Sequence, residues 1–410
     1  MKNLGIRAKA AAGTLAIVGT DAKNRALARI ADALIARQSE LLAANLTDME
    51  AARANAMRPA LLDRLELTPT RLAAIADGVR QVAALDDPTG SGEVKTRPNG
   101  LIIEKRSVPL GVIGFIYEAR PNVTADAAAL CLKSGNAVIL RGSKDAFHSN
   151  KAIVALIRDC LKASDLPEDA VLLVEDTSRE SAAQLMNLTG CVDALIPRGG
   201  AGLIKSVVEN SRVPVIETGS GICHLYVDAS ADQPNAVEIA FNAKCQRPSV
   251  CNAIEQLLVH RDIAAQFLPT LKAKLDEAHT ELRGDPESVR ILNCKPAAEE
   301  DFRTEFGDYI LALKVVGGVD EAIAHINATG TGHSEAILTN DYANAQKFLA
   351  AVDAAAVYVN ASTRFTDGFE FGLGAELGIS TQKLHARGPM GLRELTSSKF
   401  VIYGSGQIRQ

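Results

Sequence analysis

The sequence of 410 residues is poor in several features that mark particular classes of protein. It contains no tryptophan and only 4% aromatic residues, so it offers few of the stacking platforms that bind single-stranded nucleic acid. It has 44 lysine and arginine residues against 49 aspartate and glutamate residues, a formal net charge of −5. Because proteins that bind polyanions usually carry a basic surplus, we expect no nucleic acid among the main partners.

Long apolar runs are missing as well. No segment approaches the roughly 18 consecutive apolar residues of a membrane-spanning helix, so we expect no membrane contact. The mild apolar stretch 10–18 resembles a signal peptide only faintly, because Gly13 and Thr14 interrupt it and an amphipathic helix follows. We interpret it as part of an ordinary first helix.

The cysteines also lack the pattern of a disulfide framework. There are seven, widely spread and without a C-x-x-C pair, whereas a secreted chain more often has an even, clustered set. We therefore expect reduced thiols and a cytoplasmic protein. In such a protein any of the cysteines could serve as a nucleophile.

Several catalytic and nucleotide-binding motifs are absent. The sequence contains neither the P-loop pattern G-x-x-x-x-G-K-[ST] nor the dinucleotide fingerprint G-x-G-x-x-G. It has no H-E-x-x-H and no Cys/His set at metal-ligand spacing, so we expect no metal site. The nucleophile elbow G-x-S-x-G of serine hydrolases is missing too.

What the sequence does contain is an alternation of strands and helices. Region 20–85 has apolar residues at helical spacing, and a Pro-Asn-Gly turn at 98–100 separates the two arms of a predicted hairpin, 93–97 and 101–108. From Gly111 onward, short apolar runs alternate with helical patterns, which indicates an α/β fold with parallel sheets covered on both faces. The further expected strands are 111–117, 137–141, 171–174, 194–196, 213–216, 253–259, 309–315, 335–338, 355–359 and 399–403.

Most of the cysteines are predicted to be structural. Cys131 and Cys160 lie in apolar helical patterns typical of a core. Cys223 precedes His224, but adjacent residues of a strand point to opposite faces, so the two side chains are not expected to meet. Cys245 lies at the tail of a predicted helix, where terminal carbonyls disfavour a thiolate.

Cys251 has a different setting. It follows Arg247-Pro248-Ser249 in irregular backbone that leads into the predicted strand 253–259. Backbone N–H groups of a loop and the nearby charges of Arg247 or Lys244 would favour an anionic sulfur. Spacing alone leaves a structural thiol as the alternative, because buried unreactive cysteine is common.

Four segments resemble those of γ-glutamyl phosphate reductases, a family within the aldehyde dehydrogenase superfamily. Segment 241–252, FNAKCQRPSVCN, is similar to the catalytic-cysteine segment of that family, and the other three are 111–124, 135–142 and 316–337. The resemblance implies an aldehyde dehydrogenase-like α/β fold with two parallel-sheet domains and a β-hairpin flap for oligomerisation. It places the cofactor-binding domain at 1–225 and 361–395, the catalytic domain at 226–360 and the flap at 93–108 and 396–410.

The resemblance also implies a reaction. The family reduces L-glutamyl 5-phosphate with NADPH to glutamate 5-semialdehyde and phosphate, the second step of proline biosynthesis, through a thioester that would form on Cys251. The Cys251 backbone N–H and Asn122 are then the expected donors to the oxyanion. Asn122 has an equal alternative interpretation as a helix N-cap after Pro121, since Asn is a favoured cap.

The cofactor is expected to be NADPH. Lys144 and Arg141 leave the end of the second parallel strand, where a ligand binds, and their charges would attract a 2′-phosphate. The alternative is a solvated basic loop. Gly199, Gly200 and Gly202 would let backbone N–H groups approach the pyrophosphate, although turns also collect glycines. By resemblance, Glu305 contacts the nicotinamide ribose.

The substrate needs cations for its phosphate and its α-carboxylate. Arg120 and Arg247 are the candidates, with surface salt bridges as the alternative. By resemblance, His333 and Ser334 contribute to the substrate site. Glu217 matches the hydrolytic base of the superfamily, but water activation would destroy the thioester, so its role stays open.

Partners follow from the same resemblance. We expect a homo-oligomer, with glutamate 5-kinase as a possible associate. A hydrolytic NAD(P)-dependent semialdehyde dehydrogenase is the alternative enzyme. A catalytically inactive scaffold that binds metabolic partners is the alternative from another class.

Overall fold

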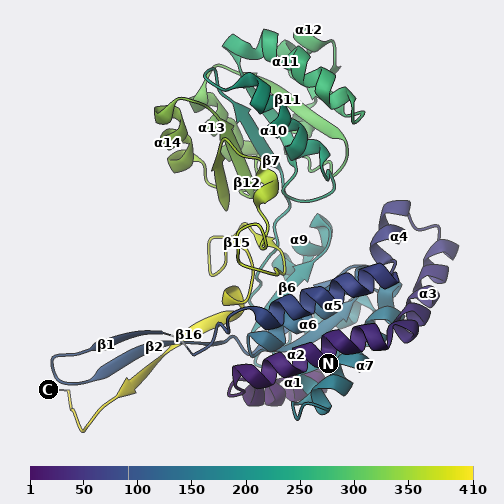
Figure 1. Cartoon of the computed structure of the whole chain (residues 1–410), viewed down its shortest axis with the longest axis vertical. Helices are drawn as coiled ribbons and strands as arrows, with labels where there is room; N and C mark the ends of the chain where they lie inside the picture. Colours follow the sequence, from purple (N-terminus) through teal and green to yellow (C-terminus); the bar gives the residue numbers. More distant parts are fainter. Residues whose placement is uncertain (91, 410) are drawn as a thin grey trace. The chain divides into compact units, whose positions relative to one another are not determined.

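The computed structural model describes residues 1–90 and 92–409, and the chain divides into two compact units (Figure 1). Unit 1 comprises 1–218, 372–378 and 390–410, and unit 2 comprises 219–371 and 379–389. The break after residue 218 precedes the predicted boundary at 225, because strand β7 (Cys223–Val227) pairs inside the sheet of unit 2. Segments 361–371 and 379–389 belong to unit 2, whereas we expected them in the cofactor domain.

Unit 1 is built on a four-stranded parallel sheet in the order β5-β4-β3-β6. Helix α1 packs against β3, β4 and β5, while α2 and α5 pack over α6. The strands are β3 (Val112–Tyr117), β4 (Ala137–Gly142), β5 (Val171–Leu173) and β6 (Ala194–Arg198). The helices are α1 (Lys2–Leu15), α2 (Thr20–Ala36), α3 (Gln38–Ala54), α4 (Pro59–Leu65), α5 (Pro69–Ala84), α6 (Pro121–Lys133), α7 (Phe147–Lys162), α8 (Arg179–Met186) and α9 (Ala201–Asn210), with 3-10 turns η1 (Lys144–Ala146), η2 (Glu168–Ala170) and η5 (Arg393–Leu395).

Unit 2 is built on a seven-stranded sheet in the order β10-β9-β11-β8-β7-β12-β13, with every neighbouring pair parallel. The strands are β7, β8 (Ile254–His260), β9 (Glu281–Gly284), β10 (Lys295–Pro296), β11 (Ile310–Val316), β12 (Ser334–Leu338) and β13 (Ala356–Val359). The helices are α10 (Gln233–Cys245), α11 (Arg261–Asp276), α12 (Pro286–Leu292), α13 (Val319–Thr329) and α14 (Tyr342–Ala351), with 3-10 turns η3 (Glu299–Arg303) and η4 (Thr363–Phe365). A two-stranded ladder, β14 (Ile379–Ser380) with β15 (Gly388–Pro389), completes it.

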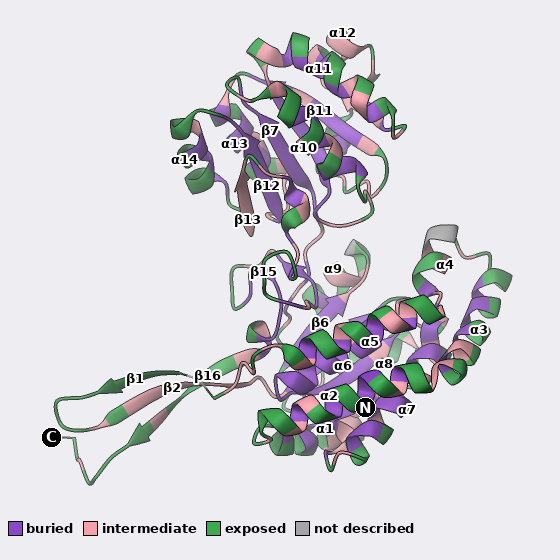
Figure 2. Cartoon of the chain, in the orientation of Figure 1, coloured by how far each residue is buried: buried purple, intermediate pink, exposed green. Residues whose placement is uncertain are grey.

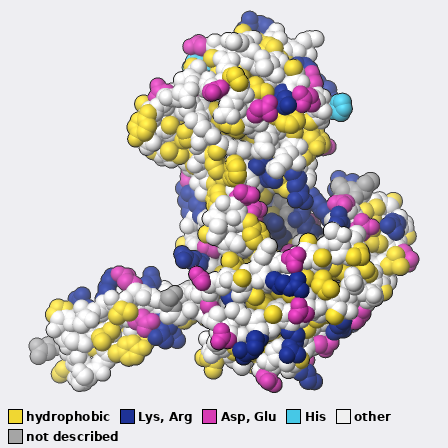
Figure 3. Space-filling view, in the orientation of Figure 1, with side chains coloured by type: hydrophobic (Ala, Val, Ile, Leu, Met, Phe, Trp, Pro, Cys, Tyr) yellow, Lys and Arg dark blue, Asp and Glu magenta, His cyan; other side chains and the backbone are white. Residues whose placement is uncertain are grey.

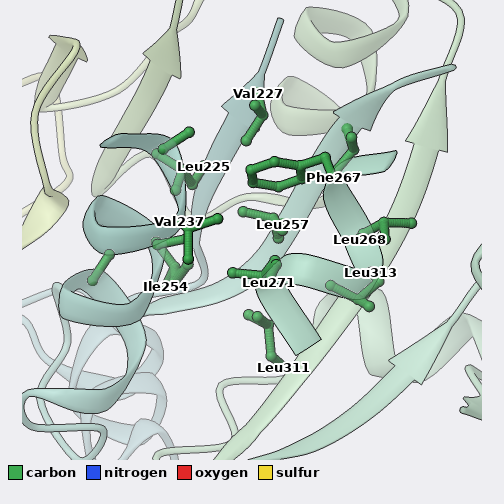
Figure 4. Packing of buried hydrophobic residues seen from close by; sticks show 14 of the residues in the cluster. Leu225, Val227, Val237, Ile254, Leu257, Phe267, Leu268, Leu271, Leu311 and Leu313 are labelled. Carbon is green, nitrogen blue, oxygen red and sulfur yellow. The ribbon is translucent and has the colours of Figure 1, made fainter. Parts of the chain in front are cut away.

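Helices cover both faces of the unit 2 sheet, so its central strands are buried throughout (Figure 2). Leu225 and Val227 of β7 point toward α10 and α11, where Phe267 and Leu271 pack against Leu257 of β8 (Figure 4). The intervening β7 residue packs with α13 and α14 on the other face. Successive side chains of a strand therefore point to opposite faces of the sheet. Because helices cover both faces, buried parallel strands have continuous apolar sequences.

Three antiparallel strands form a separate small sheet in the order β1-β2-β16, which we call the flap. They are β1 (Gly92–Thr96), β2 (Ile102–Pro109) and β16 (Thr396–Tyr403). The predicted hairpin is therefore confirmed, and the predicted C-terminal strand pairs with it along β2. Strands β1 and β16 are mostly exposed, whereas β2 between them is mostly half-buried (Figure 2), and apolar side chains lie on the surface of the flap (Figure 3).

The structure confirms most predicted elements and corrects one. The predicted strand 213–216 is only an isolated bridge between Val215 and Leu195. Helix α8 is capped by the Ser178 side chain, which accepts from the Ser181 N–H.

Candidate active site

Cys251 lies in the turn between α10 and β8 and is half-buried. Cys223 and Cys245, which precede it in sequence, are buried, and burial raises the pKa of both thiols. Cys131 is also buried, as predicted, with a raised pKa. Since a protonated, enclosed thiol is unreactive, the structure favours Cys251 over these three as a nucleophile.

The backbone of Cys251 is held by close contacts with the segment that leads into β7. A Cβ on Gly221 would lie 1.5 Å from the Cys251 carbonyl oxygen, so only glycine fits there. The Cys223 thiol donates to the same carbonyl over 3.2 Å. His224 points to the other face of β7 and bonds Glu335 at 2.8 Å, which confirms that Cys223 and His224 do not meet.

A second segment holds the cysteine loop from the side. The Asn252 amide donates to the carbonyls of Arg364 (3.3 Å) and Thr366 (2.9 Å), and the Thr363 hydroxyl donates to the Asn252 carbonyl at 2.6 Å. The Arg364 guanidinium donates to the Gln246 side-chain oxygen at 2.9 Å and to that of Asn252. Sequence reasoning missed Arg364, because 112 residues separate it from Asn252 and no local pattern indicates the contact.

The charge of Arg364 is affected by its surroundings. Burial lowers the pKa of its guanidinium, and Arg247 acts in the same direction, while the Cys251 thiol acts in the opposite one. Arg247 itself is exposed. Two guanidinium groups and the candidate nucleophile therefore interact electrostatically within unit 2.

Lys244 does not supply the charge that the sequence suggested for Cys251. Its ammonium is fully buried and bonds the Glu255 carboxylate at 2.6 Å. The other oxygen of Glu255 accepts from the Gly307 N–H at 3.0 Å. The pair thus bridges the two ends of the cysteine loop and ties them to segment 305–307, in which Glu305 is exposed.

We expect Lys244→Met to lower the free energy of unfolding by about 3–5 kcal/mol, because it leaves a buried carboxylate without its charge partner. The double variant Lys244→Met/Glu255→Gln removes both charges and keeps an acceptor for Gly307, so its loss should be smaller. Urea denaturation followed by far-UV circular dichroism measures both. Equal losses in the single and double variants would contradict the ion-pair interpretation.

The same carboxylate gives stability a pH dependence. Burial raises the pKa of Glu255 from 4.5 to about 7, against the pull of Lys244 and the Gly307 N–H. Between these values the folded state binds more protons than the unfolded state, so this group lowers stability as the pH rises through that window. Glu255→Gln should remove this contribution to the fall of the free energy of unfolding with rising pH.

His333 and Ser334 lie in a buried polar chain behind the cysteine loop. His333 Nδ1 is 3.7 Å from the Cys223 sulfur and 2.8 Å from the Ser334 hydroxyl. The hydroxyl oxygens of Ser334 and Thr366 are hydrogen-bonded at 2.7 Å, and those of Thr366 and Tyr358 at 2.6 Å. Both predicted residues are therefore fully buried, and their contact with substrate stays a prediction.

In unit 1, Asn122 lies in the first turn of α6 and is exposed. The helix begins at Pro121 with Arg120 as its N-cap residue, so the alternative of an Asn122 cap is wrong. The Asn122 amide donates to Asp126 at 3.1 Å. Burial raises the pKa of Asp126 to about 6, while this hydrogen bond acts to lower it. Glu217 is half-buried just before the break between the units.

Arg141, near the end of β4, and Lys144, just after it, lie in different surroundings. Arg141 donates to the carbonyls of Thr177 and Ser178, each at 2.7 Å, and burial lowers its pKa. Its guanidinium thus braces the loop before α8. Lys144 opens η1 and is exposed, so it can meet a ligand.

The glycines before α9 already hold an anion. The Gly200 N–H donates to the Glu118 carboxylate at 2.9 Å, and a Cβ on Gly199 would lie 2.7 Å from the carboxylate carbon of Glu118. A Cβ on Gly202 would meet no atom within 4 Å. This helix end therefore has anion affinity and open space, both of which a pyrophosphate requires.

The described residues contain neither a cluster of metal ligands nor a membrane-spanning helix. Within residues 1–90 and 92–409, no three His, Cys, Asp or Glu side chains are grouped as metal ligands. Over the same ranges, none of the helices has the length and apolar character needed to cross a bilayer.

Comparison with known proteins decides the family. The model of the aldehyde dehydrogenase family matches residues 5–291 and 293–401. The chain belongs to this family. It is 58% identical to the γ-glutamyl phosphate reductase of Carboxydothermus hydrogenoformans over 99% of both chains, and 56% identical to that of Enterococcus faecalis over 100% of this chain and 99% of the relative.

Solved structures agree. The crystal structure of γ-glutamyl phosphate reductase from Thermotoga maritima, 48% identical, superposes with a TM-score of 0.98 over 100% of this chain and 99% of its own. An acetylating aldehyde dehydrogenase from Geobacillus thermoglucosidasius, 16% identical, matches with a TM-score of 0.70 over 100% of this chain and 97% of its own, which shows the fold alone. The predicted aldehyde dehydrogenase-like fold and the resemblance to γ-glutamyl phosphate reductases are confirmed.

Proposed function

We propose that this chain reduces L-glutamyl 5-phosphate to L-glutamate 5-semialdehyde with release of phosphate, the second step of proline biosynthesis. One observation carries the proposal: full-length identity of 54–58% to proteins named γ-glutamyl phosphate reductase. The half-buried Cys251 in a rigidly held loop supports it. Reactions of the aldehyde dehydrogenase family use a nicotinamide cofactor, and NADPH is the form we propose here.

The chemistry begins at Cys251. Its thiolate attacks the acyl carbonyl, a carbon–sulfur bond forms, and the carbon–oxygen bond to phosphate breaks, which leaves a thioester and free phosphate. The carbonyl oxygen becomes negative during the attack, so the backbone N–H of Cys251 is the donor proposed to stabilise it, and a role of Asn122 stays a prediction from the resemblance. NADPH, when bound, would supply a hydride to the thioester carbon. The carbon–sulfur bond then breaks, which releases the aldehyde and the Cys251 thiolate together.

The residues of unit 1 fit a dinucleotide. The Gly200 N–H and the open space at Gly202 would hold the pyrophosphate, as the carboxylate bound there indicates. The exposed Lys144 would hold a 2′-phosphate. By resemblance, the exposed Glu305 of unit 2 would hold the nicotinamide ribose. Arg247 of unit 2 and Arg120 of unit 1 are proposed for the substrate anions.

The direct test is stoichiometry. Purified protein, NADPH and glutamyl phosphate generated in place should release one phosphate for each NADPH oxidised. The hydrolytic alternative, an NAD(P)-dependent semialdehyde dehydrogenase, would instead reduce the oxidised cofactor without any need for phosphate. The inactive scaffold would do neither.

Cofactor preference is tested at Lys144. We expect Lys144→Glu to lower the ratio of kcat/KM for NADPH over NADH at least about tenfold, because a carboxylate repels the 2′-phosphate. Lys162→Glu, at the far end of α7, is the matched control and should leave the ratio unchanged. Steady-state kinetics with both cofactors measures it, and an unaltered ratio in Lys144→Glu discards the assignment.

The flap supports the proposal of a homo-oligomer. Phe400, Ile402 and Tyr403 on β16 are 66%, 59% and 51% exposed, and such side chains are buried when a sheet finds a partner. We propose that a second copy of the chain covers them. An association with glutamate 5-kinase stays a prediction from the resemblance.

A further inference from the structure

We propose that Arg364, together with Arg247, binds the phosphate of the acyl phosphate beside Cys251. This inference rests on the proposed function, since it names the site for the group that the reaction expels. Arg364 is a substrate-binding residue that no pattern in the sequence indicated, and it belongs to unit 2 together with Cys251.

The first argument is geometric. The guanidinium of Arg364 donates to the side chains of Gln246 and Asn252, which stand on either side of Cys251 in the chain. The backbone around Arg364 is fixed to the same loop through Asn252 and Thr363. A rigid guanidinium is therefore held against the loop that carries the nucleophile.

The second argument is charge balance. The acceptors of the Arg364 guanidinium are two neutral amide oxygens, and the nearby Asp367 carboxylate accepts instead from the Phe369 and Glu370 N–H groups. Among the residues that the structure describes, neither Arg364 nor Arg247 forms an ion pair with a carboxylate. Asp367 attracts Arg364 through space but forms no ion pair with it. Two like charges that interact and that no carboxylate contacts directly favour the binding of an anion between them.

The third argument is the chemistry of the substrate. Its phosphate is bonded to the carbonyl carbon that Cys251 attacks, so it must lie next to the sulfur. The α-carboxylate is separated from that carbon by three others. A fork of guanidinium donors matches phosphate oxygens bidentately, and it also stabilises the charge that accumulates as the phosphate leaves.

The reverse reaction tests the site, because phosphate is then a separate substrate. With glutamate semialdehyde, phosphate and NADP⁺, we expect Arg364→Gln to raise the KM for phosphate at least tenfold, while the KM for the semialdehyde changes less than about twofold. Glutamine retains a donor for Asn252, so the loop should hold. Arg247→Gln, at an exposed position, should also raise the KM for phosphate. Arg290→Gln, on α12, is the matched control and should change neither.

A second readout needs no turnover and no cofactor. Inorganic phosphate should protect Cys251 of the wild type from iodoacetamide, and Arg364→Gln should need at least tenfold more phosphate for the same protection. Arg364→Lys, which keeps the charge but loses the fork, should fall between the two. If Arg364→Gln unfolds, Arg247→Gln and Arg364→Lys still test whether the arginines bind phosphate.

Two outcomes overturn the inference. One is an unchanged KM for phosphate and unchanged protection of Cys251 by phosphate in both Arg364→Gln and Arg247→Gln. The other is a rise in the KM for the semialdehyde instead of phosphate, which would place the α-carboxylate at Arg364. A wild type without any phosphate-dependent NADP⁺ reduction refutes the proposed function itself, and the protection assay then still reports whether the anion site exists.

Discussion

Cys251→Ser should lower kcat by at least about a thousandfold, the largest effect expected for any single substitution in this chain. A serine hydroxyl is far less ionised than a thiol near neutral pH, so the acyl transfer step fails. The oxygen is smaller than sulfur and fits the same turn, so stability should change little. The reverse assay and a thermal unfolding curve measure the two quantities.

Cys294→Ser is the matched control for this prediction. Cys294 is also half-buried and lies in unit 2, but its segment is remote in sequence and its pKa is raised by burial. It should keep full activity. Iodoacetamide should therefore inactivate the wild type and Cys294→Ser at the same rate. If Cys251→Ser retained a tenth of the wild-type activity, Cys251 would not be the nucleophile.

Gly221→Ala should give the second largest effect. The new methyl group would lie 1.5 Å from the carbonyl oxygen of Cys251 and 2.4 Å from its carbonyl carbon, and backbone atoms cannot rotate away as a side chain can. The loop must move as a whole. We expect kcat to fall at least about a hundredfold, because a shift of about 1 Å at a reacting group costs that much, and overpacking should cost about 1–3 kcal/mol of stability.

Gly78→Ala is the control for the added methyl group. Gly78 lies inside α5, and a Cβ there meets no atom within 4 Å, so alanine should stabilise the protein by about 0.5–1 kcal/mol. Activity should not change. Wild-type activity in Gly221→Ala would show that the close approach to Cys251 is not required.

The sequence alone was informative wherever the cause is local. The helix that begins at Pro69 has Thr68 as its cap, with the Arg71 N–H donating to the side chain, and each of these residues is a neighbour of the others. The hairpin of the flap follows from the turn at 98–100 in the same way. Cys251 stands out for a similar reason, because a loop between a helix and a buried strand can be recognised from spacing.

Contacts between distant segments could not be predicted. The sequence predicts Lys244 as a charge near Cys251, but in the fold its ammonium donates to the Glu255 carboxylate. The guanidinium of Arg141 donates to the carbonyls of Thr177 and Ser178, which no local pattern indicated, and its contact with a cofactor stays a prediction. In both cases the ammonium or guanidinium found a partner that only packing brings near.

The amino-acid sequence by itself thus determined the α/β class and the family, and it singled out Cys251 as the candidate nucleophile, because periodicity, turn residues and long motifs are properties of neighbouring positions. Only the tertiary structure decided what surrounds that nucleophile: the glycine beneath its carbonyl, the buried ion pair that closes its loop, and the arginine at position 364. These contacts join strands and loops that lie up to 112 residues apart, and such pairings are fixed when the sheet buries its apolar faces, which no local pattern records.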